Sequence, residues 1–284
     1  MVLVAFLWST AGAVSRHLEY ARGFELTFWR SLFAATSLLL ILPYFQGRAV
    51  FRKIRDGRVT LWLCGACWAI MFTAYMVALT LTTVGNVLVT LAVGPLLTAL
   101  AARIFIGYRI PLRTWCAIVV AGAGIAYMFA SQMGSVSLLG SLVAFSVPVA
   151  AAVNWTISQH AHDQGSDVDL VPAVLLGAAM STLGIAAFAF PLQANLHDVV
   201  LLGSLGVFQL AVPCVLCVVC ARVLHAPEIS LLQLLEVIFG ILLAWLGANE
   251  APGASVLTGG ALVIGALVFN EWLGWKTSPA RAVP

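Results

Sequence analysis

Charged side chains are scarce in this chain of 284 residues. Only 9% of the residues are charged and 62% are hydrophobic, whereas an average soluble domain is about one quarter charged. Fourteen Lys and Arg with eleven Asp and Glu cannot cover the surface of a soluble domain of this length. The scarcity of charge therefore excludes a soluble globular protein, and it implies that much of the surface faces lipid.

Several signatures of chemistry are missing as well. The sequence has no H-E-x-x-H, G-x-S-x-G or G-x-x-x-x-G-K-[ST] pattern, which are the motifs of metalloproteases, serine hydrolases and nucleotide-driven pumps. A net charge of +3 is too small to indicate a nucleic-acid partner. All six cysteines lie inside apolar runs, where we expect them to be reduced and to pack between helices. We therefore expect no cofactor, no metal and no enzymatic activity.

What the chain has instead is apolar runs of membrane-spanning length. About 20 apolar residues cross the hydrocarbon core as a helix, and Gly, Pro and charged residues separate ten such runs. The ten runs cover residues 1–15, 24–43, 59–80, 84–106, 112–131, 138–159, 168–190, 198–221, 227–247 and 254–275. Pro95 and Pro148 interrupt two of them. The first run could instead be a signal peptide, although it has no basic segment before it.

Basic residues predict how the runs are oriented. Arg and Lys concentrate in loops on the cytoplasmic side of membrane proteins. Here they crowd the connection from 44 to 58, where Arg52, Lys53 and Arg55 lie, and the stretch from 103 to 113. If both connections are cytoplasmic, both termini are cytoplasmic too. We therefore predict a multi-pass protein of the bacterial inner (plasma) membrane.

The chain also contains a weak copy of itself. Residues 3–6 read Leu-Val-Ala-Phe, and so do residues 142–145, at an offset of 139. The stretch 86–128 aligns with 227–269 at an offset of 141. A nearly constant offset indicates duplication, which predicts one repeat over 1–131, a second over 138–275 and a cytoplasmic tail over 276–284. Five spans are an odd number, so the second repeat must be inverted relative to the first.

Short motifs in several runs point to one family. They are Leu7-Trp8-Ser9-Thr10, Phe28-Trp29-Arg30, Val93-Gly94-Pro95, Gly206-Val207-Phe208-Gln209, the run from Leu231 to Val237, Glu250 and Gly259-Gly260-Ala261-Leu262. With these motifs the chain resembles, over essentially its whole length, the EamA-type ten-helix members of the drug/metabolite transporter superfamily. The resemblance implies export or uptake of amino acids, metabolites or drugs.

Two positions depart from the pattern of that family. Glu236-Val237 stands where the family often has Glu-Pro, and Gly107-Tyr108-Arg109 stands where it has Gly-Glu at the end of the fourth span. The activities of the family are therefore implied only as a class.

A few polar side chains lie deep in the apolar runs. Glu236 is near the middle of the ninth run, where an ionised side chain costs about 2.5–3.5 kcal/mol on insertion scales. Gln233 lies on the same helical face, and Gln209 lies in the eighth run. One interpretation is that these three residues line a substrate cavity, with Glu236 binding an amine or a proton. The other is that they form hydrogen bonds that hold helices together.

The first three runs supply further candidates for substrate binding. Trp8 lies beside Ser9 and Thr10, and Tyr75 lies in the third run; aromatic rings can stack on a flat or cationic substrate. Arg30 either extends outward to the lipid headgroups or faces inward and binds a carboxylate. Arg30 together with Glu236 would suit a zwitterion.

These observations predict an all-α integral membrane protein of ten transmembrane helices, arranged as two inverted five-helix repeats. The expected function is secondary transport of a small solute by alternating access. The resemblance favours amino acids, metabolites or drugs as substrates, and export as the direction. The rivals are a membrane enzyme or lipid-handling protein acting at the membrane interface, and a structural subunit that packs on partner helices. Membrane lipid is an expected partner, while proton coupling and the oligomeric state stay open.

Overall fold

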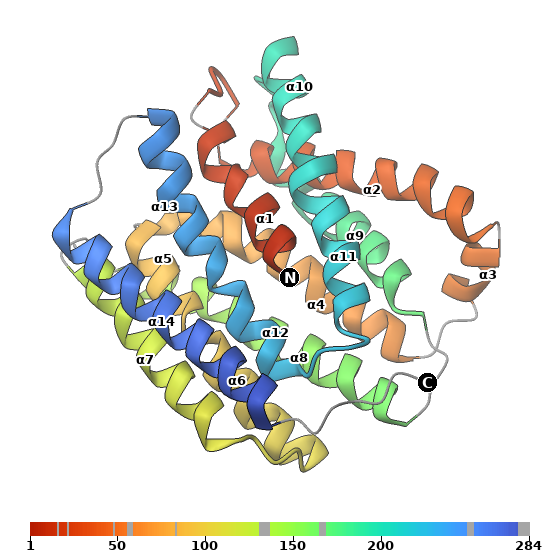
Figure 1. Cartoon of the computed structure of the whole chain (residues 1–284). Helices are drawn as coiled ribbons and strands as arrows, with labels where there is room; N and C mark the ends of the chain where they lie inside the picture. The colour runs from red at the N-terminus through yellow and green to blue at the C-terminus, as the bar shows by residue number, and fades with distance from the viewer. Residues whose placement is uncertain are drawn as a thin grey trace.

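A computed structural model gives the architecture of the chain. It describes residues 1–15, 17–21, 23–47, 49–55, 59–82, 84–130, 137–164, 169–248 and 253–277. Within these ranges every regular element is a helix (Figure 1). The predicted all-α class is confirmed for the described residues. The motif residue Glu250 and several basic loop residues, among them Arg48 and Arg58, lie outside them.

The helices divide between the two halves of the chain. The first half forms α1 (Val2–Ser15), α2 (Phe24–Gln46), α3 (Ala49–Arg55), α4 (Val59–Leu81), α5 (Val84–Leu91), α6 (Gly94–Ala101), η1 (Ala102–Ile106) and α7 (Leu112–Phe129). The second half forms α8 (Leu138–Asp163), α9 (Val171–Ala189), α10 (Leu196–Ser204), η3 (Leu205–Ala211), α11 (Val212–Cys220), α12 (Ala226–Gln233), α13 (Leu235–Ala248) and α14 (Ala254–Thr277). The short helix α3, in the basic connection, was not expected from the sequence.

Most of these helices are suited to a membrane. Among the described residues, seven stretches are long and apolar enough to cross one: Phe24–Phe45, Val59–Leu81, Asn86–Ile106, Leu138–Asp163, Val171–Ala189, Leu196–Cys220 and Ala226–Leu243. Shorter apolar helices cover the three other predicted spans, at Val2–Ala11, Leu112–Met128 and Ala254–Asn270. The structure thus indicates a multi-pass membrane protein, whereas the count of ten crossings stays a prediction.

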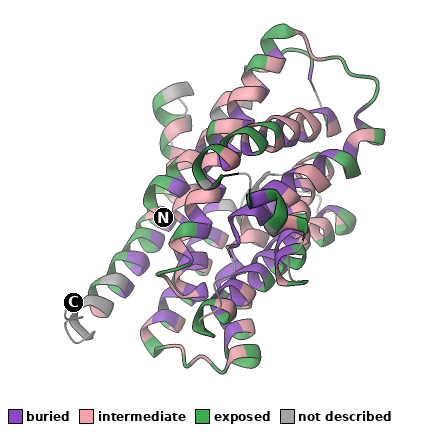
Figure 2. Cartoon of the chain, turned by 90° about the vertical axis from the view of Figure 1, so that its right-hand side faces the viewer, coloured by how far each residue is buried: buried purple, intermediate pink, exposed green. Residues whose placement is uncertain are grey.

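The lateral surface is apolar, as a lipid-facing surface must be. Phe105, Leu183 and Leu246 are 77%, 78% and 78% exposed. Figure 2 shows exposed residues along the outer sides of the helices and buried residues where the helices meet. Exposed apolar surface of this extent would promote aggregation in water, so its environment is the hydrocarbon of a bilayer.

Three predicted spans are not regular helices. The span 84–106 is divided into α5, α6 and the π-helical η1, and the span 227–247 is divided into α12 and α13. The span 198–221 contains the π-helical η3 between α10 and α11. The expected interruption at Pro148 is wrong, because α8 continues through that residue. Cys116 is exposed on α7, so the expectation that every cysteine packs between helices also fails there.

The tightest helix contacts depend on small residues. A Cβ atom added to Gly177 of α9 would lie 2.3 Å from Cβ of Trp68 on α4. At the contact between α7 and α14, a Cβ atom on Gly124 would lie 2.9 Å from the carbonyl oxygen of Gly259. Both distances are shorter than van der Waals contact. Glycine therefore sets how closely α4 approaches α9 and α7 approaches α14.

Candidate functional site

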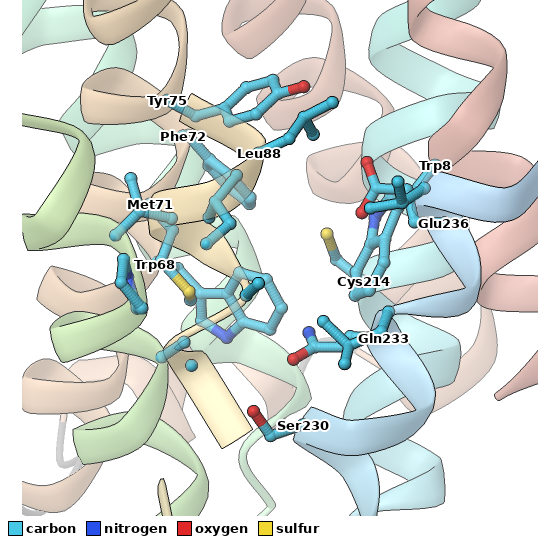
Figure 3. A pocket seen from close by; sticks show the side chains of 18 of the residues that line it. Trp8, Trp68, Met71, Phe72, Tyr75, Leu88, Cys214, Ser230, Gln233 and Glu236 are labelled. Atoms are coloured by element: carbon cyan, nitrogen blue, oxygen red, sulfur yellow. The ribbon is translucent and has the colours of Figure 1, made fainter. Parts of the chain in front are cut away.

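A cavity of about 160 Å³ lies between helices of the two halves. Its walls come from α1, α2, α4, α5 and α6 of the first half and from α8, η3, α11, α12 and α13 of the second. Figure 3 shows Tyr75 at one end of the cavity and Ser230 at the other, with Glu236 and Gln233 on one wall and Met71 and Trp68 on the opposite one.

Six of the eight candidate residues lie in the wall of this cavity. They are Trp8, Arg30, Tyr75, Gln209, Gln233 and Glu236. Ser9 and Thr10 are not among the lining residues. Their hydroxyl groups donate to carbonyl oxygens of their own helix, Ser9 to Phe6 at 2.6 Å and Thr10 to Leu7 at 2.7 Å. Successive residues on a helix point about 100° apart. Because Trp8 faces the cavity, Ser9 and Thr10 point away from it.

Arg30 is an inward-facing residue. Its side chain is 4% exposed, and its Nη1 donates to Oε1 of Gln209 at 3.4 Å. Nε2 of Gln209 in turn donates to the carbonyl oxygen of Trp8 at 3.3 Å. The alternative in which Arg30 extends outward to the headgroups is therefore wrong. Nε of Arg30 has no hydrogen-bond partner within the described part of the chain, so a donor of this guanidinium is left for a further acceptor.

Glu236 lies in the first turn of α13 and points into the cavity (Figure 3). It interacts electrostatically with Arg30, but the Arg30 guanidinium donates to Gln209 instead. A cation and a carboxylate thus face one small cavity from α2 and α13, on opposite halves of the chain. Such separated charges can bind the carboxylate and the ammonium group of one ligand.

Aromatic and apolar side chains form the rest of the wall. Trp68 and Phe72 of α4 line it together with Trp8 and Tyr75. Trp155 does not line the cavity, but it packs edge-to-face on Trp68 with ring centroids 5.5 Å apart. A cavity of about 150 Å³ admits a ligand of the size of benzene. The observed volume therefore suits a compact solute with one ring or a branched aliphatic group.

Two further residues of the wall, Ser230 and Cys214, were not predicted from the sequence. Ser230 precedes Gln233 by three residues on one helical face, so a search for polar residues at that spacing would have found it. Cys214 gives no comparable signal, because it is one of several small residues in an apolar run.

Two helix breaks lie beside the cavity, at equivalent positions of the two halves. Between α5 and α6, the N–H of Val93 donates to the carbonyl oxygen of Thr90 at 3.2 Å. Between α12 and α13, the N–H of Leu234 donates to the carbonyl oxygen of Leu231 at 3.1 Å. The two bonds are related by the offset of 141 residues that the sequence repeat predicts. Broken spans at corresponding positions of two repeats are typical of the binding region of secondary transporters.

The fold and the cavity define a class, that of multi-pass helical membrane proteins with a partly polar binding cavity between their helices. The model of the EamA-like transporter family matches residues 1–130 and 138–272. The chain therefore belongs to this family, within the drug/metabolite transporter superfamily, and it is a membrane transporter.

A solved structure described only as "Crystal structure of protein" has the same fold. The similarity has a TM-score of 0.74 at 16% sequence identity, over 98% of this chain and 96% of that one. No curated protein matches the chain. At this identity the structural comparison establishes the fold alone.

Proposed function

We propose that this protein is a secondary transporter that carries a small zwitterionic solute, such as an amino acid or a related metabolite, by alternating access. The observation that carries the proposal is the cavity with Arg30 on one wall and Glu236 on another, beside two equivalent helix breaks. Broken spans let parts of a helix pivot about a site near the middle of the membrane. Export across the bacterial inner membrane, with both termini cytoplasmic, is part of the proposal.

Reciprocal packing supports two inverted repeats, over 1–131 and 138–275, followed by a tail over 276–284. α4 of the first half packs on α8 and α9, and the equivalent span of the second half, α10 with η3 and α11, packs on α1 and α2. The α2–α9 and α7–α14 contacts each join equivalent spans of the two halves. The family model also matches in two segments, 1–130 and 138–272. Two related bundles can exchange conformations, so that the cavity opens to either side in turn.

Counterflow tests the proposal directly. Proteoliposomes containing the purified protein are preloaded with a mixture of unlabelled neutral amino acids, and uptake of a labelled pool is followed. Protein-dependent accumulation is the expected result. Absence of accumulation with amino acids, together with accumulation of a purely cationic or purely anionic metabolite, would contradict the zwitterion while keeping transport.

Restoring a regular helix at the first break should slow the transport cycle. Proline has no N–H, so Pro95 leaves the carbonyl of Leu91 without its usual donor four residues ahead. Pro95→Ala supplies that donor, and a hydrogen bond of about 1 kcal/mol that must break in each cycle lowers turnover about fivefold. We expect Vmax for counterflow to fall by this factor while KM changes less. An unchanged Vmax would show that the break at Val93 does not move during transport.

A further inference from the structure

A buried carboxylate joins the two halves at one end of the helix bundle. Asp198, in the first turn of α10, is completely buried. Its two carboxylate oxygens accept the backbone N–H groups of Glu19, Tyr20 and Ala21, each at 2.8 Å. These three residues lie in the connection between α1 and α2, which belongs to the first half. One side chain of the second half thus holds a loop of the first.

A second carboxylate makes the reciprocal contact. Glu25, in the first turn of α2, is 4% exposed. Its Oε1 and Oε2 accept the N–H of Gln193 at 3.0 and 3.1 Å, and Oε1 also accepts the N–H of Ala194 at 2.9 Å. Both donors lie in the connection between α9 and α10. At this end of the bundle, which we call the Asp198 end, each half therefore holds a loop of the other.

These contacts continue along the same elements to the cavity. Glu25 and the cavity residue Arg30 both lie on α2. The helix α10, which carries Asp198 in its first turn, continues into η3, which carries Gln209. The Arg30–Gln209 hydrogen bond joins these two elements at the cavity. Gly206 lets them approach closely, because a Cβ atom there would lie 2.6 Å from the carbonyl oxygen of Arg30. The seam between α2 and the α10–η3 span thus runs from the Asp198 end to the site.

We propose that Asp198 and Glu25 form the gate that closes the cavity toward the Asp198 end, a role that rests on the proposed alternating access. Every loop donor in the gate is a backbone N–H, so separation of the loops exposes the N–H groups and both carboxylates to water without unwinding a helix. Hydrogen bonds to ionised carboxylates are stronger than neutral ones, and they favour the closed state. A ligand carboxylate that draws Arg30 away from Gln209 loosens the same seam, which links binding to opening.

Cys214 provides a reporter for this gate, since it lines the cavity. In a chain whose five other cysteines are replaced by alanine, a small membrane-impermeant thiol reagent is added either to intact cells or to inside-out vesicles. Under the proposed topology the Asp198 end faces outward. We expect Asp198→Asn and Glu25→Gln each to raise the labelling rate of Cys214 from outside by about tenfold, since one charged hydrogen bond of the gate is worth at least that factor. Labelling from inside should not rise.

A carboxylate outside the gate gives the control. Asp163 is exposed in the last turn of α8, and within the described part of the chain it makes no contact with the loops that Asp198 and Glu25 hold. Asp163→Asn should leave the labelling rate of Cys214 unchanged. A rise from inside-out vesicles alone would support the gate and reverse the assumed topology. Unchanged labelling in both gate variants, or an equal rise from both sides, would overturn the gate.

Hydrogen exchange in the chain with all native cysteines tests the gate a second way. Asp198 accepts hydrogen bonds from the backbone N–H groups of residues 19–21, and Glu25 accepts hydrogen bonds from those of Gln193 and Ala194. If the two carboxylates open together, Asp198→Asn speeds exchange at 193–194 as well as at 19–21. Faster exchange confined to 19–21 would overturn the gate. Neither measurement uses a substrate, so a failure of counterflow would contradict the proposed function without deciding the gate.

Discussion

Replacing Glu236 by glutamine is expected to raise the KM for neutral amino acids in counterflow by about 30-fold or more. In the proposed complex, the Glu236 carboxylate receives the substrate ammonium group while Arg30 binds the substrate carboxylate. Truncating one partner of a buried, hydrogen-bonded charge pair costs about 2–5 kcal/mol, and 2 kcal/mol corresponds to roughly 30-fold in affinity. Glutamine keeps the size of the side chain and an oxygen that accepts hydrogen bonds, so the loss of affinity measures the contribution of the negative charge.

Two controls separate this role from a structural one. Glu236→Asp retains the charge and should recover part of the affinity. Transport of the deaminated carboxylate analogue, which lacks the ammonium group, should be affected much less by Glu236→Gln than transport of the amino acid. Equal KM values for wild type and Glu236→Gln would contradict substrate binding by this residue.

The same variant tests proton coupling separately. If Glu236 also carries the coupled proton, Glu236→Gln loses accumulation driven by a pH gradient even at substrate concentrations that restore counterflow. If gradient-driven accumulation persists under those conditions, coupling does not pass through Glu236.

The sequence predicts the position of most cavity residues, for a physical reason. A polar or charged side chain in an apolar span requires a protein or water partner, so Arg30, Gln209, Gln233 and Glu236 had few places to lie. The orientation of Arg30 could not be predicted from the sequence, because a long side chain can extend to the headgroups or turn inward. Its burial against Gln209 depends on how closely Gly206 of η3 packs on α2.

Helix breaks show a similar limit. The break before Pro95 could be predicted, since proline removes a helical N–H. The equivalent break at Leu234 has no proline beside it and leaves no mark in the local sequence. The contacts of Asp198 and Glu25 could not be predicted from the sequence either. They join residues far apart in the chain: Tyr20 and Asp198 are separated by 178 positions, and Glu25 and Ala194 by 169. No local pattern encodes such a pair.

The length of the apolar runs located the spans, because a helix needs about 20 apolar residues to cross the hydrocarbon core. Seven stretches of the described chain meet that requirement, and the three other predicted spans are covered by shorter apolar helices. The helix α3 was not predicted, because its seven residues, which include Arg52 and Arg55, are too few for a periodic signal.

Replacing Gly177 by alanine is expected to destabilise the fold more than any other single methyl addition on α9. The added Cβ would lie 2.3 Å from Cβ of Trp68 and 3.1 Å from the carbonyl oxygen of Gly65. Neither atom is the end of a flexible side chain, so α9 must move away from α4 by roughly 1 Å to restore van der Waals contact. Overpacking of this kind costs about 1–3 kcal/mol, and occasionally more.

Gly184 provides the matched control for Gly177. It lies on the same helix, and a Cβ atom there would have no neighbour within 4 Å. Gly184→Ala should therefore gain the helix propensity of alanine, up to about 1 kcal/mol, without a clash. In thermal unfolding of the detergent-solubilised protein, we expect Gly177→Ala to lower the apparent Tm by roughly 5 °C or more and Gly184→Ala to hold or raise it. Because Trp68 lines the cavity, the displacement of α9 from α4 in Gly177→Ala should also weaken counterflow. Equal Tm values for Gly177→Ala and Gly184→Ala would contradict the close α4–α9 contact.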